Sequence, residues 1–125
     1  MAETSIQSYR DLKVWQEAMN LAESCYQVTK SFPREEIYGM TSQIRRSAVS
    51  VAANIAEGYG RKNRGEYIQF LYIAQGSLKE LETHILLAIR VELQSLQILN
   101  SVLNQCDSVG KLLLLLIRAL ESKSK

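Results

Sequence analysis

The sequence predicts an all-α fold: an antiparallel, up-down-up-down four-helix bundle that is oligomeric. Apolar residues recur at steps of three and four along nearly the whole chain, which is the spacing of one helix face. One proline and six glycines leave long uninterrupted stretches with short connections between them. No segment has the strict alternation of a half-buried strand. The 125 residues suffice for one domain with a single core.

The first helix is expected over residues 9–31, after a flexible N-terminus over 1–8. Ser8 and Asp11 have the spacing of a capping box, and Pro33 ends the segment because the residue before a proline disfavours the helical conformation. The line expected to face the core is Leu12, Trp15, Met19, Ala22, Tyr26 and Thr29. A second apolar line beside it is Val14, Leu21 and Val28.

The second and third helices are expected over residues 41–59 and 64–90. Gly58 and Gly60 are expected to end the second helix, and Asn63 with Glu66 to cap the third. Gly76 lies inside the third helix, opposite its core line, where glycine costs about 1 kcal/mol relative to alanine. It marks either a close approach by another chain or tolerated sequence drift. The two expected core lines are Ile44, Ala48, Val51, Ile55 and Tyr59, and Tyr67, Phe70, Leu71, Ala74, Leu78, Leu81, Ile85 and Ala88.

The fourth helix is expected over residues 96–121, capped by Ser95 and followed by a frayed end over 122–125. Its apolar arc covers roughly 200°, where a surface helix needs about 100°. We therefore predict a homo-oligomer whose interface uses surplus apolar positions and the open side of Gly76. The alternative is that these positions close only the monomer's own core. The candidate interface residues are Val14, Leu21, Val28, Gly76, Ile98, Val109, Leu112 and Leu116.

The sequence offers no recognisable catalytic or metal-binding motif, so we predict no enzyme activity and no cofactor. The single histidine, His84, lies one turn after Glu80 and is interpreted as a hydrogen-bonded boundary residue. Cys25 and Cys106 fall on or near apolar faces of different helices and are interpreted as core thiols of a reducing compartment. The longest apolar run is far shorter than the roughly 20 residues of a membrane span, so we expect a cytoplasmic protein without membrane contact.

Basic residues cluster although the formal net charge is only +2. Between residues 45 and 64 the single acid is Glu57, and the loop cations precede a helix whose free amides and dipole favour an anion. This predicts phosphate contacts. In the alternative interpretation, Arg45 is a partly buried salt-bridge member, with Glu57, Glu80 or Glu82 as partners for Arg45 or Arg46, and the loop cations are solvated. The candidate nucleic-acid-binding residues are Arg45, Arg46, Arg61, Lys62 and Arg64.

Four stretches of the chain resemble a known family. They are DLKVWQ from residue 11, FPREE from residue 32, YGMTSQIRRSAVSVAANIAEG from residue 38 and FLYIAQGSLKELET from residue 70. Together, from residue 9 to about 90, they resemble the four-helix-bundle family of 23S rRNA-intervening-sequence proteins. Many members have proline where this chain has Ala52. The fourth helix is the least family-like segment, so its packing is expected from periodicity alone.

The resemblance implies a left-handed bundle that assembles as a ring-like homo-oligomer, with a pentamer expected. Such proteins are encoded within insertions in bacterial large-subunit rRNA genes or elsewhere in bacterial genomes. A more distant relative is the accessory protein of diversity-generating retroelements, a basic pentameric barrel that binds reverse transcriptase and nucleic acid. The family's polar motif falls on Gln43, Arg45, Arg46, Ser50, Asn54, Glu57 and Gly58, with Arg61 after it.

Together, these observations favour a non-enzymatic oligomeric bundle that binds rRNA or another nucleic acid through a basic surface. The competing hypothesis is a scaffold or adaptor that binds a partner protein without direct nucleic-acid contact. In that case the polar motif is structural. Tyr72, expected to be exposed on the outer side of the third helix, is either an ordinary surface tyrosine or a residue that stacks on a base or on a partner.

Overall fold

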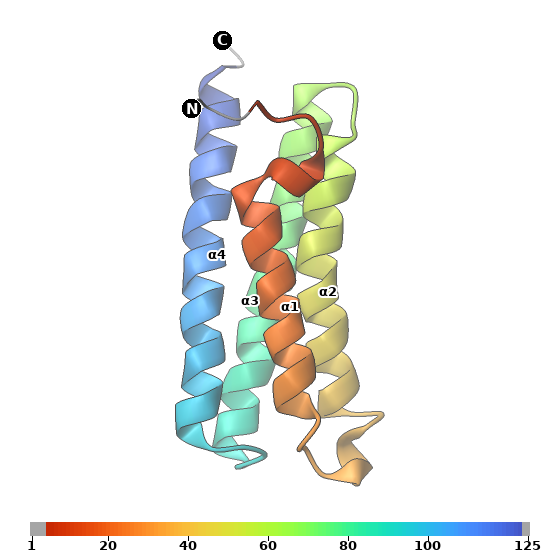
Figure 1. Cartoon of the computed structure of the whole chain (residues 1–125), viewed down its shortest axis with the longest axis vertical. Coiled ribbons are helices and arrows are strands. Elements are labelled where there is room, and N and C mark those ends of the chain that lie inside the picture. Colours follow the sequence, from red (N-terminus) through yellow and green to blue (C-terminus); the bar gives the residue numbers. More distant parts are fainter. Residues whose placement is uncertain (1–4, 124–125) are drawn as a thin grey trace.

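The computed structural model describes residues 5–123, which form four long α-helices and two short 3-10 turns. The helices are α1 (Lys13–Thr29), α2 (Met40–Tyr59), α3 (Arg64–Arg90) and α4 (Leu96–Ser122), and the turns are η1 (Tyr9–Asp11) and η2 (Arg34–Glu36). Each helix packs against the next along the chain, and α4 packs against α1 (Figure 1). This part of the chain contains no strand, as predicted. Within residues 5–123, none of the helices has the length and hydropathy needed to span a bilayer.

α1 is shorter than the helix expected over 9–31. The capping box of Ser8 and Asp11 is present, but it caps η1, and extended backbone at Leu12 separates this turn from α1. The flexible N-terminus expected over 1–8 lies partly outside the described residues. Within them, the backbone N–H groups of Gln7 and Ser8 donate to the Asp11 carboxylate at 2.9 and 3.1 Å, so this segment is held in place.

The buried face of α1 differs from the expected one. Val14, Ala18, Leu21 and Cys25 are almost fully buried, whereas Met19 and Tyr26 are 45% and 43% exposed. α1 packs against both α2 and α4. The side of α1 that lies between these two neighbouring helices therefore faces the core. The larger side chains of the expected line lie at the edge of α1 that faces α2. The expectation that Met19 and Tyr26 face the core was therefore wrong.

The core lines expected for α2 and α3 are confirmed at Ile44, Ala48, Val51 and Ile55, and from Leu71 to Ala88. Tyr59, Tyr67 and Phe70 are half-buried. In α4 most of the wide apolar arc serves the same core. The fully buried residues of α4 are Leu99, Val102, Cys106, Val109, Leu113 and Ile117. This wide arc is used because α4 packs against both α3 and α1. α4 continues to Ser122, inside the end expected to fray, and residues 124–125 lie outside the described residues.

Gly58 does not end α2, contrary to expectation, but lies inside the helix, packed closely against α3. A Cβ atom at this position would lie 2.7 Å from Phe70 Cβ and 3.2 Å from the Tyr67 carbonyl oxygen. The helix ends at Tyr59, with Gly60 as its C-cap. The loop that follows positions α3 through Asn63, whose side chain accepts the Glu66 N–H at 2.8 Å.

Candidate nucleic-acid interface

The five candidate cations do not form one patch. Arg45 and Arg46 lie in the second turn of α2, and Arg61, Lys62 and Arg64 lie beyond its C-terminal end. At 1.5 Å per residue, α2 separates the two groups by about 24 Å along its axis. The contiguous basic segment of the sequence therefore becomes two sites near different ends of the bundle.

Arg45 binds α1. Its Nε donates to Thr29 Oγ1 at 2.9 Å, its Nη2 donates to the Tyr26 carbonyl at 3.4 Å, and its guanidinium lies 4.5 Å from the centre of the Tyr26 ring. A cation is favourable at this place because the last turn of a helix carries partial negative charge. Within residues 5–123 no carboxylate lies within ion-pair distance of Arg45, so the salt bridge considered for it is not formed.

We predict that Arg45→Ala lowers the free energy of unfolding by about 1–2 kcal/mol, because two charge-assisted hydrogen bonds and a cation–π contact are lost. Nucleic-acid affinity of the folded variant should not change. Urea unfolding and anisotropy titrations check the two parts, with Arg45→Lys as the variant that keeps the charge. If Arg45→Ala left the free energy of unfolding unchanged but lowered nucleic-acid affinity, Arg45 would be part of the binding interface instead.

Arg46 belongs to a line of polar contacts between α2 and α3, which we call the polar seam. Arg46 forms an ion pair with Glu80 and donates to Gln43 Oε1 at 2.8 Å, which confirms Glu80 as a partner of Arg46. Glu80 also lies 3.3 Å from His84 Nε2. The hydrogen bond from Arg46, helped by His84, holds the pKa of Glu80 below its ordinary value despite some desolvation.

The polar seam continues along α2 through Ser50 and Asn54. Ser50 Oγ lies 2.9 Å from Ser77 Oγ on α3, and Asn54 Nδ2 donates to the Ser50 carbonyl at 2.8 Å. Ser50, Asn54 and Ser77 are half-buried. This part of the polar motif, expected to be functional or structural, therefore joins α2 to α3 or braces α2 itself.

Arg61 makes an ion pair and a cation–π contact within the chain. Its guanidinium lies 3.2 Å from a Glu57 carboxylate oxygen and 4.6 Å from the centre of the Phe70 ring. Both members of the ion pair are about half exposed, and such surface pairs contribute little stability. Arg61 can therefore exchange Glu57 for a phosphate at low energetic cost.

Five cations lie towards the end of the bundle that holds the α2–α3 loop, and we call the group Arg10, Arg61, Lys62, Arg64 and Lys123 the basic end. Arg64 Nη1 donates to the Lys123 carbonyl at 2.7 Å, and η1, which carries Arg10, packs against α2. Figure 1 shows that η1, the loop and the end of α4 lie at the same end. Sequence reasoning missed Arg10 and Lys123 because only the fold places them beside the loop.

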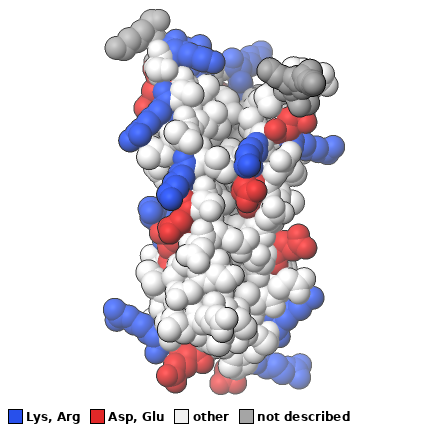
Figure 2. Space-filling view, turned by 60° about the vertical axis from the view of Figure 1, so that its left-hand side comes forward, with Lys and Arg blue, Asp and Glu red and all other residues white. Residues whose placement is uncertain are grey.

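On the face shown in Figure 2, cations and acids are interspersed over the upper half, and the surface below them is largely uncharged until the charges at the lower end. Lys62 is exposed, and no acidic side chain of residues 5–123 forms an ion pair with it. Tyr72, expected to be exposed, is 47% exposed, and its hydroxyl donates to the Glu121 carboxylate at 2.8 Å. This hydrogen bond is the main reason that the pKa of Tyr72 is raised.

Most candidate interface residues belong at least partly to the chain's own core. Val14, Leu21 and Val109 are buried in it, which corrects the expectation that they face another copy. Three more, Val28, Leu112 and Leu116, are half-buried and pack against it. Ile98 remains 42% exposed, and a Cβ atom at Gly76 would meet no atom within 4 Å.

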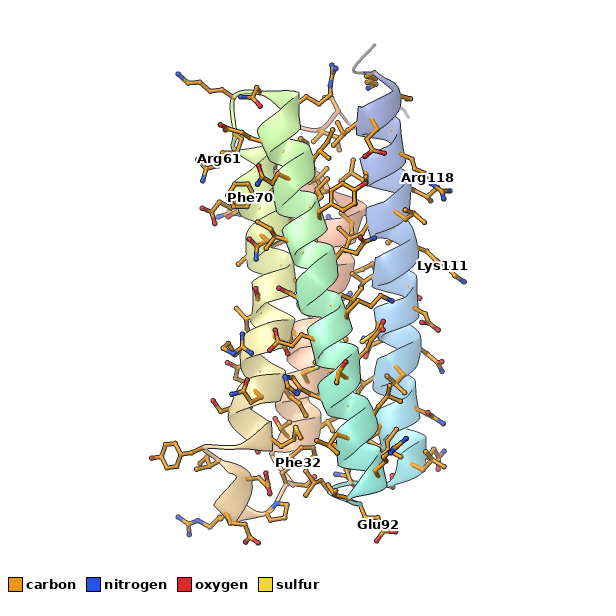
Figure 3. All side chains as sticks on the ribbon, turned by 180° about the vertical axis from the view of Figure 1, so that it is seen from behind. Phe32, Arg61, Phe70, Glu92, Lys111 and Arg118 are labelled. Atoms are coloured by element: carbon orange, nitrogen blue, oxygen red, sulfur yellow. The ribbon has the colours of Figure 1, made fainter. Side chains whose placement is uncertain are left out.

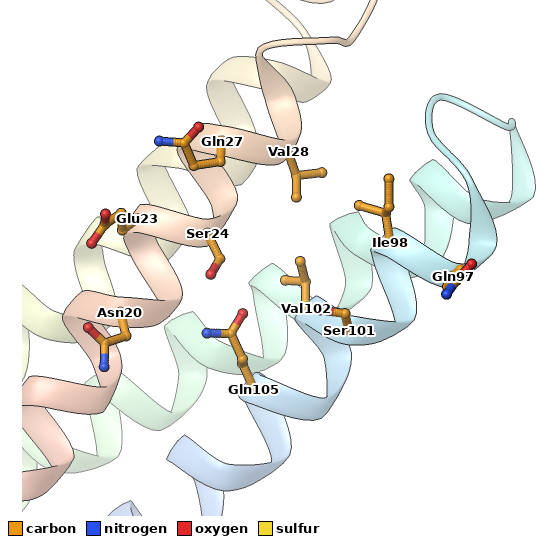
Figure 4. Close-up of a pocket in the computed structure, with 10 residues that line it drawn as sticks. All are labelled: Asn20, Glu23, Ser24, Gln27, Val28, Gln97, Ile98, Ser101, Val102 and Gln105. Atoms are coloured by element: carbon orange, nitrogen blue, oxygen red, sulfur yellow. The ribbon is translucent and has the colours of Figure 1, made fainter.

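A groove of about 520 Å³ lies between α1 and α4 (Figure 4). Val28 on α1 faces Ile98 and Val102 on α4, and Ser24 faces Gln105. Most of the groove surface is apolar, and the amide and hydroxyl groups around it offer both hydrogen-bond donors and acceptors. Its polar lining residues are Asn20, Glu23, Ser24, Gln27, Gln97, Ser101 and Gln105.

Neither metal-ligand clusters nor reactive thiols are found in the part of the chain that the structure describes. No group of three or more His, Cys, Asp or Glu side chains within residues 5–123 could hold a metal ion. Cys25 and Cys106 are buried free thiols, and desolvation raises the pKa of each to about 12. Both cysteines are therefore core residues, as predicted.

Similarity to known proteins extends over most of the bundle. A solved structure from Bacteroides thetaiotaomicron, described as a protein with unknown function from the S23 ribosomal protein family, is 28% identical to this chain. The match covers 83% of this chain and 97% of that chain, with a TM-score of 0.75. A search of curated proteins finds no match. The model of the 23S rRNA-intervening sequence protein family matches residues 10–114, most of α4 included. The chain therefore belongs to the 23S rRNA-intervening sequence protein family.

Proposed function

We propose that this protein is a non-enzymatic, cytoplasmic homo-oligomer of antiparallel four-helix bundles that binds RNA or DNA through its basic end. The observation that carries the proposal is the gathering of exposed cations from three distant segments at one end of the bundle. Arg45 and Arg46 are not part of this interface, because Arg45 is held against α1 and both lie in the second turn of α2, away from the α2–α3 loop.

The chemistry of the basic end suits phosphate groups. Lys62 and Arg64 supply long cations, and the first turn of α3 points its positive dipole end, and the backbone amides that Asn63 does not cap, towards the same region. Contacts of this kind read the charge and shape of a nucleic acid rather than its bases. We therefore propose binding with weak sequence preference and strong salt dependence.

We predict that Lys62→Glu weakens binding to a structured rRNA fragment about tenfold at low salt, because an uncompensated cation is replaced by an anion. The slope of log K against log salt should fall by about 1. Fluorescence anisotropy titrations over a series of salt concentrations measure both quantities.

Lys30→Glu is the matched control, because Lys30 is also an exposed lysine but follows α1 at the other end of the bundle. It should leave affinity nearly unchanged. Circular dichroism verifies that both variants are folded. Equal losses for the two variants, or wild-type binding that is insensitive to salt, would overturn the basic end as the interface.

The second candidate function is a protein scaffold, favoured by the groove between α1 and α4. Its amide lining suits the hydrogen-bonding groups of a peptide rather than a phosphate backbone, since Glu23 lines it and no cation does. Co-purification from the source organism with and without nuclease separates the two functions. Partners that survive nuclease and depend on Gln105 would favour the scaffold.

A further inference from the structure

A small hollow of about 240 Å³ lies where the end of α1, the turn η2 and the start of α2 meet. Among the described residues, three cations line this hollow: Lys30, Arg34 and Arg45. No acidic side chain of residues 5–123 lines it, and none forms an ion pair with any of the three cations. Three like charges around one hollow repel one another, so an anion between them is favourable.

Arg45 is held in one orientation at the wall of this hollow. Its Nε and Nη2 donate to Thr29 Oγ1 and to the Tyr26 carbonyl, and its guanidinium lies over the Tyr26 ring. The remaining nitrogen, Nη1, donates to no acceptor within residues 5–123. An acceptor in the hollow therefore meets a donor that is already positioned, and little free energy is lost in ordering it.

Thr41 supplies a hydroxyl donor that the chain itself does not use. Thr41 is only 6% exposed, yet its hydroxyl forms no hydrogen bond within residues 5–123. The hydroxyls of Thr29, Ser47 and Thr83 donate to the carbonyl four residues earlier in their helices. Thr41 does not, since it lies in the first turn of α2 and Ile37 precedes that helix. No enclosed side-chain nitrogen or oxygen in the described range lacks a partner, so the Thr41 hydroxyl opens onto the hollow that Thr41 lines.

The acids closest in the sequence do not occupy the hollow. Glu35 and Glu36 belong to η2, but neither of them lines it. Glu36 Oε1 accepts the Met40 N–H at 3.1 Å, so this carboxylate caps the start of α2. The anion site therefore consists of side chains and does not depend on the helix N-terminus.

The size and chemistry of the hollow define its occupant. Pockets for drug-sized ligands measure about 300–1,000 Å³, so this smaller hollow suits a single compact group. Three cations and a hydroxyl donor favour a doubly charged oxyanion, and the exposed Ile37 can cover an apolar substituent on it. We propose that the hollow formed by Lys30, Arg34, Thr41 and Arg45 binds a phosphoryl group, as free phosphate or as a small phosphate monoester.

This phosphoryl site is separate from the basic end. Figure 3 shows Phe32, which lines the hollow, at the opposite end of the bundle from Arg61. The phosphoryl site therefore does not depend on nucleic-acid binding at the basic end, and each can fail without the other.

The first test titrates the full chain with inorganic phosphate and with phenyl phosphate at low salt, and follows the backbone amide chemical shifts. At about pH 8 both probes carry a mainly dianionic phosphoryl group. Saturable shifts should be confined to residues 29–45. Tighter binding of phenyl phosphate would support a monoester as the ligand, and binding of phosphate at least as tight would support the free ion.

Arg34→Gln should weaken phosphate binding about tenfold, because a charge-assisted hydrogen bond is lost. Arg34 is exposed, so the fold should survive. Arg90→Gln is the matched control, because Arg90 is an exposed arginine that ends α3 at the same end of the bundle without lining the hollow. The control should leave phosphate affinity nearly unchanged.

Thr41→Val removes the hydroxyl and keeps the shape of the side chain. It should weaken phosphate binding about three- to tenfold without lowering the free energy of unfolding, because the hydroxyl has no partner within the described chain. Thr41→Ser keeps the donor and should bind phosphate like the wild type. Urea unfolding without phosphate measures the stability of each variant. A purely structural Thr41 would give the opposite result, with lower stability and unchanged affinity.

Two charge reversals separate the phosphoryl site from the basic end. Lys30→Glu should abolish phosphate binding in the hollow and leave nucleic-acid binding unchanged, whereas Lys62→Glu should do the reverse. Four results would overturn the inference: no saturable shifts at residues 29–45 with either probe, equal losses for Arg34→Gln and Arg90→Gln, wild-type affinity in Thr41→Val, or loss of both ligands in Lys30→Glu. Unchanged nucleic-acid binding in Lys62→Glu would overturn only the basic end.

Discussion

Cys25 and Cys106 will react about a thousandfold more slowly with a thiol reagent in the folded protein than in the unfolded chain near neutral pH. Burial raises the pKa of each thiol from its ordinary value of 9.0 to about 12. Three pKa units correspond to roughly a thousandfold smaller fraction of thiolate, which is the reacting species. Exclusion of the reagent from the core slows the reaction further.

Labelling with a chromogenic disulfide, with and without denaturing urea, measures this difference. Both thiols should become accessible to the reagent over the same range of urea concentration, because they lie in one core. The raised pKa values also predict how the stability of the fold changes with pH. Stability from the neutral buried thiols is fully present below pH 9 and is lost as the pH rises from 9 towards about 12. Rapid labelling of either thiol in the folded state would contradict the core position and would reopen a redox role.

Replacing Gly58 with alanine will lower the free energy of unfolding by about 2–3 kcal/mol, through overpacking between α2 and α3. The new methyl group would lie 2.7 Å from Phe70 Cβ and 3.2 Å from a backbone oxygen. Neither atom is the free end of a flexible side chain, so the two helices must move apart. Chemical denaturation measures the loss, and the packing of Arg61 over Phe70 should be disturbed with it.

Gly76→Ala is the matched control, because the same substitution is made inside a helix but into open space. It should raise the free energy of unfolding by about 0.5–1 kcal/mol, the ordinary gain in helix propensity. Loss of stability in Gly76→Ala, or tolerance of Gly58→Ala, would show that the approach of α2 to α3 differs from the one described.

The periodicity of the sequence predicts the fold well where one helix face is clearly apolar. The core lines of α2 and α3 and the helix caps at Asn63 and Ser95 can be predicted from residues that are neighbours in the sequence. In α1, two apolar lines lie side by side, and only packing against α2 and α4 decides which one is buried. Gly58 has the local appearance of a helix stop, while its contact with Phe70 depends on how closely α3 packs.

The candidate interface was harder to predict because it depends on distances that sequence separation hides. Arg45 and Lys62 look close in the sequence, but a helix lies between them. Arg64 and Lys123 look remote, but a hydrogen bond joins them. Charge clusters that span a helix therefore separate in space, whereas charges at helix ends gather wherever the connections bring those ends together.

Because both ends of the described chain lie at the same end of the bundle as the α2–α3 loop, the choice of fusion site decides which surface an experiment can observe (Figure 1). An affinity tag on either terminus, or attachment to a sensor surface through it, would place foreign material over the basic end and would imitate a loss of nucleic-acid binding. Tyr38, 94% exposed in the turn between α1 and α2 at the other end, is the better anchor. A label attached there leaves the basic end facing the solution.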